Sequence, residues 1–111
     1  MTIATKFGMR YPLIQGGMAN IATAQLAAAV SNAGGLGLVG AGGMTTDMLR
    51  ENIRKCREMT PNLFGVNLML MHPQIDEMAK IVVEEGVKFV TTGAGNPAKY
   101  MDAWKAAGMT L

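Results

Sequence analysis

Short apolar segments alternate with amphipathic segments along the whole chain, and this alternation constrains the fold more than any other feature. Apolar residues fill the segments 13–14, 36–39, 64–70 and 87–92, and each segment is followed by a turn and then a helical pattern. Such a rhythm predicts βαβ units and a parallel sheet. Residues 109–111 have the pattern of the start of a fifth strand.

Four helices are expected between these strands. Caps, stop signals and the spacing of apolar residues place them at about 23–33, 47–59, 73–85 and 96–107. The inward-facing residues are expected to be Leu26, Val30, Leu49, Ile53, Cys56, Ile75, Ala79, Val82, Tyr100, Trp104 and Ala107. The second helix also carries basic residues on its other face, and we interpret that face as solvated: Arg50, Arg54, Lys55 and Arg57.

Four βα units and the start of a fifth strand make half of a (β/α)8 TIM barrel, an α/β fold that typically needs about 250 residues in full. Residues 1–111 are therefore expected to be the N-terminal part of a longer barrel domain, truncated at the start of the fifth strand. A small flavodoxin-like domain is the alternative, although it would normally end with a fifth strand and a closing helix.

A half-barrel would leave two strand edges and the inner face of its sheet open to water. Unpaired edges tend to associate with other strands, and exposed apolar side chains forgo the free energy of burial. We therefore expect the isolated chain to form a homo-oligomer, in which two copies could pair their edges.

The first strand ends at the clearest candidate for a ligand site. Residues 11–15 run into Gly16 and Gly17, which are followed by Met18. Backbone without side chains and a flexible thioether can both lie against a flat ring. Ligands bind at the carboxyl ends of strands in parallel α/β folds. The alternative is a tight turn that needs glycine only for its φ angle.

Asn67 is the one polar residue in an otherwise apolar strand, 64–70. A buried amide without partners costs about 1–3 kcal/mol. A polar group is therefore expected beside Asn67.

Composition and charge exclude several classes of protein. Half of the 111 residues are hydrophobic, 16% are charged, and the net charge is only +2. These values exclude a disordered chain and argue against a nucleic-acid partner. No apolar run is long enough to span a membrane, and the turns lack the clustered Cys, His or carboxylate ligands of a metal site. A lone cysteine and the absence of a signal-peptide pattern favour the cytoplasm.

Four segments together resemble the start of the flavin-dependent enoyl-[acyl-carrier-protein] reductases. They are residues 11–19, 25–37, 64–70 and 91–97, which read YPLIQGGMA, QLAAAVSNAGGLG, FGVNLML and TTGAGNP. These reductases and the nitronate monooxygenases belong to one superfamily of FMN-binding TIM barrels. The resemblance covers almost the whole chain, but only about the first third of such an enzyme.

The resemblance implies a reaction as well as a fold. The monooxygenases tend to have Ala-Pro-Met where this chain has Gly16, Gly17 and Met18, so the reductases are favoured and nitronate oxidation is the alternative. A reductase of this kind uses NADH or NADPH and FMN to reduce the 2,3 double bond of an enoyl-acyl-carrier-protein thioester in fatty acid synthesis. A third possibility is an inactive half-barrel that folds only as an oligomer or with the rest of its polypeptide.

The same resemblance implies where FMN would bind. Gly16, Gly17 and Met18 would lie against the isoalloxazine, Asn67 would hydrogen-bond its polar edge, and Gly93 would leave room beside it. The family's phosphate-binding glycines and its catalytic histidine belong to later strands, so no catalytic residue is expected here.

Two further residues invite a chemical role but are interpreted as structural. His72 is the only histidine and follows the third strand, yet it does not match the family's catalytic position. Cys56 falls on the inward stripe of a helix and is interpreted as a small core residue.

Overall fold

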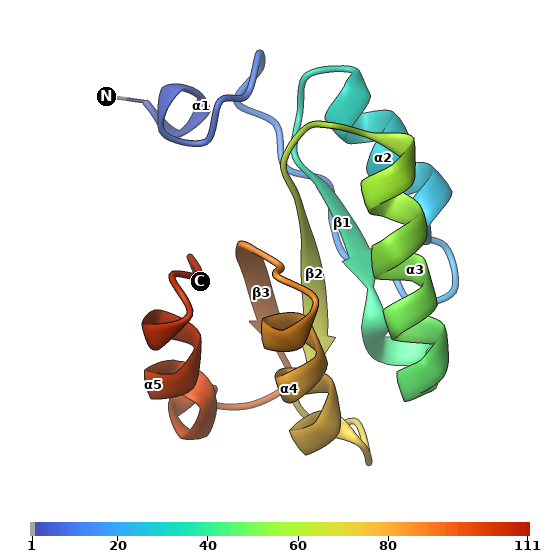
Figure 1. Ribbon diagram of the computed structural model, residues 1–111, viewed down its shortest axis with the longest axis vertical. Coiled ribbons are helices and arrows are strands. Elements are labelled where there is room, and N and C mark those ends of the chain that lie inside the picture. Colours follow the sequence, from blue (N-terminus) through green and yellow to red (C-terminus); the bar gives the residue numbers. More distant parts are fainter. Residues whose placement is uncertain (1) are drawn as a thin grey trace.

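Three parallel strands form the centre of the molecule (Figure 1). The computed structural model describes residues 2–111. The strands are β1 (Gly37–Gly40), β2 (Phe64–Met69) and β3 (Phe89–Gly93), and they lie in chain order with β2 in the middle. Two single bridges extend the sheet at its edges, because Ile14 pairs in parallel with Leu36 and Thr110 pairs in parallel with Phe89. Five parallel segments therefore follow one another in sequence order, as the half-barrel predicts.

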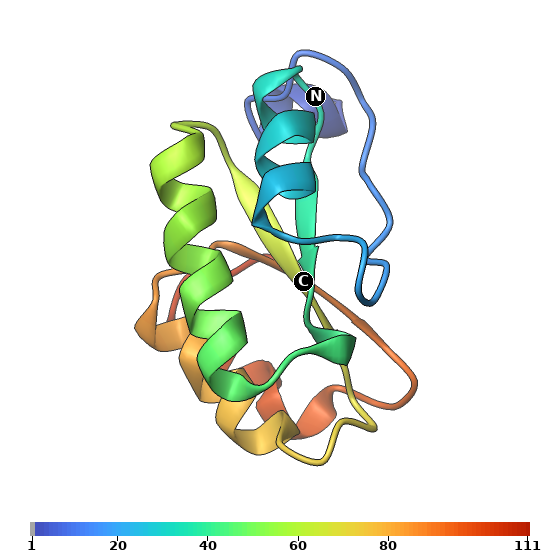
Figure 2. The ribbon, with the colours of Figure 1, turned by 90° about the vertical axis from the view of Figure 1, so that its right-hand side faces the viewer.

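Each strand leads into a helix. The longer helices are α2 (Ala24–Asn32), α3 (Thr46–Met59), α4 (Ile75–Glu84) and α5 (Ala98–Ala106), and a 3₁₀ turn, η1 (Ala41–Gly43), follows β1. Neighbouring helices pack side by side, α2 on α3 and α3 on α4, along one face of the sheet (Figures 1 and 2). None of the helices in residues 2–111 is both long and apolar enough to cross a membrane.

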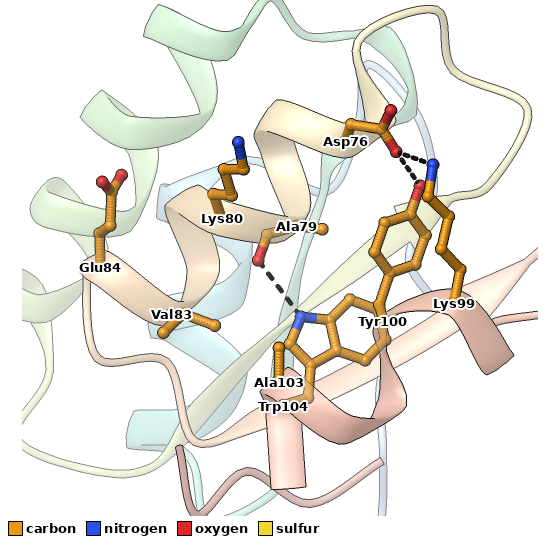
Figure 3. A pocket seen from close by; sticks show the side chains of 9 residues that line it. All are labelled: Asp76, Ala79, Lys80, Val83, Glu84, Lys99, Tyr100, Ala103 and Trp104. Atoms are coloured by element: carbon orange, nitrogen blue, oxygen red, sulfur yellow. Dashed lines mark hydrogen bonds and ion pairs between the residues drawn. The ribbon is translucent and has the colours of Figure 1, made fainter. Parts of the chain in front are cut away.

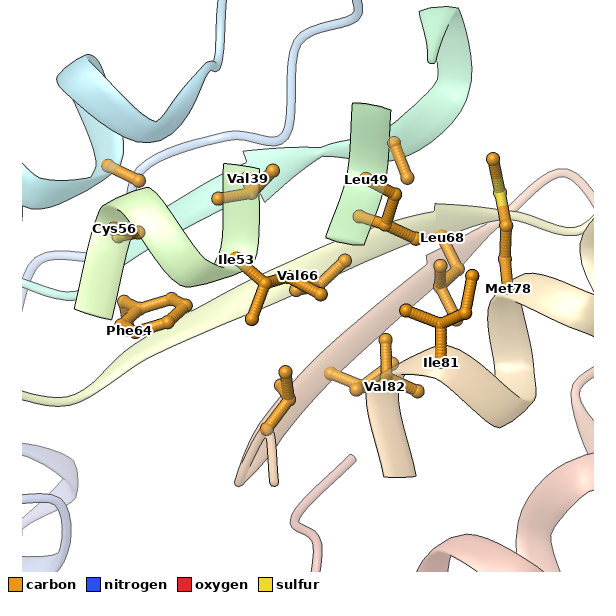
Figure 4. Close-up of a cluster of buried hydrophobic side chains, with 14 of the residues drawn as sticks. Val39, Leu49, Ile53, Cys56, Phe64, Val66, Leu68, Met78, Ile81 and Val82 are labelled. Carbon is orange, nitrogen blue, oxygen red and sulfur yellow. The ribbon is translucent and has the colours of Figure 1, made fainter. Parts of the chain in front are cut away.

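The main core lies between these helices and the sheet (Figure 4). Leu49, Ile53 and Cys56 of α3 are fully buried there, as their spacing predicts. They meet strand side chains that point to the same side, such as Val39 and Val66. In α4 the buried residues are Met78, Ala79, Ile81 and Val82. Each medium-sized side chain of this kind contributes about 1.5–3 kcal/mol on burial.

The prediction for α2 was wrong about which residues face the sheet. Leu26 and Val30 are only partly buried, and the buried residues are Ala24, Ala27, Ala28 and Ser31. The reason is a close approach of backbones, since a Cβ on Gly37 would lie 2.5 Å from the carbonyl carbon of Ala27. Only small residues fit on the helix face that meets β1 at this distance.

The first predicted strand is reduced to one bridge, and it is not buried on both faces. Leu13 is 66% exposed and Ile14 is 42% exposed. The backbone still pairs with β1, because Leu36 N donates to Leu13 O and Gln15 N donates to Leu36 O. Figure 2 shows this early segment, in blue, running along one edge of the molecule. Its other side has no neighbouring strand in residues 2–111.

A short N-terminal helix, α1 (Ile3–Lys6), lies at the end of the sheet where the strands begin (Figure 1). The residues after it cover the inner face of the sheet. Phe7 meets Phe89 edge to face at a centroid distance of 5.2 Å, and Met9, Leu36 and Leu38 are buried beside them. The expectation that the inner face lies open to water is therefore wrong for this layer.

The basic face of α3 is not simply solvated. Arg50 and Arg54 pair with Glu85 just after α4, at 2.7 and 2.9 Å, and Arg57 donates to the Glu85 carbonyl. The Glu85 side chain is only 8% exposed. Hydrogen bonding, first of all from Arg54, lowers the pKa of the Glu85 carboxyl, and burial opposes the shift. This face therefore joins α3 to the end of α4.

Candidate functional site

The carboxyl ends of the strands face one rim, at the arrowheads in Figure 1. Four connections follow these strand ends: residues 15–23, η1, residues 70–74 and residues 94–97. All of the residues that sequence analysis assigned to a flavin lie on this rim or at the ends of its strands. The rim is the candidate functional site.

Gln15 fastens the first connection to β1. Its side-chain amide hydrogen-bonds to both backbone groups of Leu38. Leu38 N donates to Gln15 Oε1 at 3.2 Å, and Gln15 Nε2 donates to Leu38 O at 2.9 Å. The side chain thus continues the parallel pairing that the backbone began at Ile14. Sequence analysis did not single out Gln15. The available signal was an amide side chain at the last strand position before two glycines.

Gly17 lies directly on the side chain of Asn67. A Cβ at Gly17 would fall on the Asn67 Cβ and would lie 2.6 Å from its Cγ. Neither Gly16 nor Gly17 is among the residues with positive φ. The alternative that these glycines serve only a left-handed turn is therefore wrong, because Gly17 is needed for close packing.

Asn67 finds its polar partners within the chain. Its amide Nδ2 donates to Gly17 O at 3.4 Å, and its Oδ1 accepts from the Thr91 hydroxyl at 2.8 Å. Thr91 is the β3 residue in register with Asn67. The expectation of a neighbouring polar group is confirmed, but the chain itself supplies this group. Thr91 is a site residue that sequence analysis missed.

Other predicted residues border open space. A Cβ at Gly16 or at Gly93 would meet no atom within 4 Å. The Met18 side chain is 45% exposed. The Met18 backbone carbonyl lies close to Gly40, because a Cβ added to Gly40 would lie 2.8 Å from the Met18 oxygen. The structure therefore brings Gly17 and Asn67 into contact and leaves Gly16, Met18 and Gly93 accessible.

These features fit a flat heteroaromatic ligand such as the flavin ring. Gly16 and Gly93 present bare backbone to open space, and Met18 adds a soft side chain. Asn67 still has hydrogen-bonding capacity, since an amide offers two N–H donors and two acceptor lone pairs and the chain uses one of each. Within residues 2–111, no group of three metal-ligating side chains lies together.

His72 and Cys56 have structural environments. His72 Nδ1 accepts from Gln74 N at 3.0 Å, so its Nε2 carries the proton and donates to Met44 O at 2.8 Å. The ring thus ties the connection after β2 to the one after β1. Cys56 is buried in the core, as predicted, and burial raises the pKa of its thiol to about 11.

A groove of about 570 Å³ lies between α4 and α5 and is not part of the rim (Figure 3). Its floor is structural, because the buried Trp104 donates from Nε1 to Ala79 O at 3.2 Å and stacks on Tyr100 at 5.4 Å. At one end Asp76 accepts hydrogen bonds from Lys99 and Tyr100. These contacts join the two helices, and Lys80 and Glu84 also line the groove.

The sequence is similar to known proteins over most of its length. The profile of the nitronate monooxygenase family matches residues 2–106. A probable nitronate monooxygenase of Staphylococcus haemolyticus is 47% identical over 68 residues, which are 61% of this chain and 19% of the relative. A probable nitronate monooxygenase of Staphylococcus aureus is 47% identical over 66 residues, again 19% of its length. The chain thus matches less than a quarter of the length of these relatives.

Solved structures match almost the whole chain. FabK from Thermotoga maritima superposes with a TM-score of 0.95 at 45% identity, over 99% of this chain and 36% of that protein. Nitroalkane oxidase from Streptomyces ansochromogenes superposes with a TM-score of 0.84 at 24% identity, over 96% of this chain and 40% of that protein. The fold is thus that of the N-terminal part of these TIM barrels.

Proposed function

Because the chain belongs to the nitronate monooxygenase family, whose profile matches residues 2–106, we propose that it forms the N-terminal part of an FMN-dependent oxidoreductase. We propose further that the complete protein reduces the 2,3 double bond of enoyl-acyl-carrier-protein, with NADH or NADPH as the hydride donor. The observation that carries this choice is the likeness to FabK, which extends over 99% of the chain at 45% identity. The matches to the staphylococcal relatives extend over about three fifths of it.

The proposal gives each residue of the rim a task. When bound, FMN would relay a hydride from the nicotinamide to the β-carbon of the enoyl thioester. Gly16 and Gly93 leave the space in which a flat ring can lie. Met18 offers a polarizable contact, and Asn67 supplies hydrogen bonds to the polar edge of the ring. The proton donor and the phosphate site would come from strands beyond residue 111.

Oxidation of alkyl nitronates is the second candidate. The name of the family and the names of the staphylococcal relatives, which are 47% identical in the matched segments, favour it. Both reactions need a flavin at the rim, so the rim geometry by itself is equally suited to either. They differ in the second substrate, which is a nicotinamide cofactor for the reductase and oxygen for the monooxygenase.

The two candidates are separated by assaying one preparation of the complete protein that carries this chain. We expect NADH or NADPH to be consumed without oxygen when a trans-2-enoyl thioester is added, in step with loss of the double bond. Oxygen uptake with an alkyl nitronate, without use of the enoyl thioester, would instead establish the monooxygenase.

Flavin content is the second readout of this experiment. The complete protein should carry about one FMN per chain, whereas the 111-residue chain alone should carry none, because the phosphate of such ligands is usually bound after strands seven and eight. A complete protein that binds no FMN would contradict the proposal for both reactions. Stoichiometric FMN in the isolated chain would contradict the assignment of the phosphate site to the missing strands.

A further inference from the structure

We propose that Thr91 is a positioning residue that fixes the orientation of the Asn67 amide, so that Asn67 presents an N–H donor to a ligand acceptor at the rim. This inference rests on the proposed function, because it takes the ligand to be FMN. It is carried by the contacts that join Gly17, in the first connection of the rim, to Asn67 of β2 and Thr91 of β3.

The first step concerns the two ends of the Asn67 amide. Gly17 O is a carbonyl and can only accept a hydrogen bond, so the amide group facing it must be the NH₂. Its contact with Asn67 Nδ2 is long, at 3.4 Å. The Gly17 carbonyl therefore selects the amide orientation but holds it weakly, since hydrogen bonds between nitrogen and oxygen are usually about 2.7–3.2 Å long.

The second step concerns the Thr91 hydroxyl. It donates its single proton to Asn67 Oδ1 at 2.8 Å, a distance at which the hydrogen bond is fully formed. A flipped amide would turn its oxygen toward the Gly17 carbonyl and place two acceptors face to face. A hydroxyl can either donate or accept, so the Gly17 carbonyl selects the orientation of the amide and the short hydrogen bond from Thr91 holds the amide in it.

The third step concerns what remains for a ligand. With one N–H on Gly17 and one lone pair on Thr91, Asn67 retains one N–H donor and one acceptor site. The Thr91 oxygen has spent its proton, so it can only accept. A group that approaches Asn67 Nδ2 must therefore bring an acceptor, such as a carbonyl oxygen or an unprotonated ring nitrogen of the flavin.

The role of Thr91 can be tested by substitutions that change the shape of its side chain very little. Valine has nearly the shape of threonine, suits a strand equally well and lacks the hydroxyl. Serine keeps the hydroxyl without the methyl group. Thr92 is the matched control, because it is the next residue of β3, points to the opposite face of the sheet and pairs in register with the buried Leu68.

The experiment measures the FMN dissociation constant of the complete protein by titrating its flavin-free form. We expect Thr91→Val to raise the dissociation constant about threefold to tenfold, the range that corresponds to losing one oriented hydrogen bond. Thr91→Ser and Thr92→Val should both stay within about twofold of the parent.

A double-mutant cycle with Asn67→Ala separates positioning from a general structural role. If Thr91 acts through Asn67, the effect of Thr91→Val on FMN binding should disappear when Asn67 is already alanine. An effect of equal size in both backgrounds, or parent-like binding by Thr91→Val, would overturn the inference and leave the proposed function standing. Absence of FMN binding by the parent protein would overturn both.

Discussion

At the scale of single residues, the tightest constraint in the site is the contact of Gly17 with Asn67. A methyl group at Gly17 has no free space, because its carbon would lie 2.6 Å from Asn67 Cγ. Gly17→Ala should therefore lower the free energy of unfolding by about 1–3 kcal/mol, the usual cost of overpacking. Gly16→Ala is the control, since its Cβ would meet nothing within 4 Å. Urea unfolding of both variants checks this, and equal stabilities would contradict the close packing.

Cys56 gives a second prediction at this scale. Burial raises the pKa of its thiol from 9.0 to about 11, so at pH 8 only about one thiol in a thousand is ionised in the folded chain. We expect Ellman's reagent to modify Cys56 at least about a hundredfold more slowly in buffer than in denaturant, because only the thiolate reacts. Rapid modification of the folded protein would show that α3 does not bury this residue.

The same thiol makes stability depend on alkaline pH. The pKa is higher in the folded chain, so the unfolded chain loses the thiol proton first as the pH rises. The contribution of the neutral thiol is therefore complete below pH 9.0 and is lost between pH 9.0 and about 11. A Cys56→Ala variant should lack this part of the pH dependence.

Some site residues could be predicted because their side-chain chemistry alone indicates a role. Others could not, because their role depends on a residue of another strand that lies beside them. A lone amide in an apolar strand indicates a polar partner, and Asn67 has one. That the partner is Thr91 follows only from the register of β2 and β3, which a strand pattern does not specify. Gln15 was missed for the same reason, because its task is to pair with the backbone of another strand.

At the scale of elements, the clearest tertiary interaction is the set of ion pairs that joins α3 to the end of α4. Glu85 receives hydrogen bonds from Arg50 and Arg54 and is almost buried. Glu85→Gln should lower the free energy of unfolding at pH 7 by about 1 kcal/mol, a value kept small because the arginines are partly exposed to solvent. Glu51→Gln is the control, since Glu51 pairs only with Lys55 on the exposed surface of α3.

The pH dependence of this effect has a definite sign. Hydrogen bonds from the arginines lower the pKa of Glu85 in the folded chain below its value of 4.5 in an unfolded one. The stabilisation is therefore present above about pH 4.5 and is lost as the pH falls through the lower pKa of the folded chain. The difference between the parent and Glu85→Gln should shrink on acidification. A difference that persists at pH 2 would contradict a charge-based link.

The elements that the sequence predicted best are those whose packing follows a simple period. In α3 the apolar spacing identified Leu49, Ile53 and Cys56 correctly. In α2 the same reasoning failed, because a close approach at Gly37 favours alanine over larger side chains. The basic face of α3 was also misjudged, since its partner Glu85 is about thirty positions away in the chain and no local pattern connects them.

At the scale of the whole molecule, five of the ten exposed large apolar residues in residues 2–111 lie in one segment at the first edge of the sheet. Tyr11, Leu13, Ile14, Met18 and Ile21 are all exposed, and all belong to the segment that pairs with β1 through a single bridge. The inner face contributes less exposed apolar surface than expected, because Phe7 and Met9 pack at its start. The reason to expect association therefore lies at this edge.

We expect the 111-residue chain to sediment as a dimer or larger species at micromolar concentration. Ile14→Lys should weaken self-association at least about tenfold, because lysine on a strand edge opposes pairing with another strand. Met71→Lys is the control, since Met71 is the most exposed large apolar residue yet lies away from that edge. A well-folded monomer at all concentrations would contradict the prediction.

The N-terminal cover of the sheet has a consequence for synthesis on the ribosome. Residues 2–9 leave the exit tunnel before any strand that they cover, so Phe7 and Met9 are already present when Leu36, Leu38 and Phe89 emerge. The nascent chain can therefore shield its inner apolar layer as soon as β3 is made, without waiting for later segments. Protein synthesis proceeds at about 5–20 residues per second. Early shielding therefore shortens the time during which a partly synthesised barrel exposes apolar surface to chaperones and to neighbouring chains on the same messenger RNA.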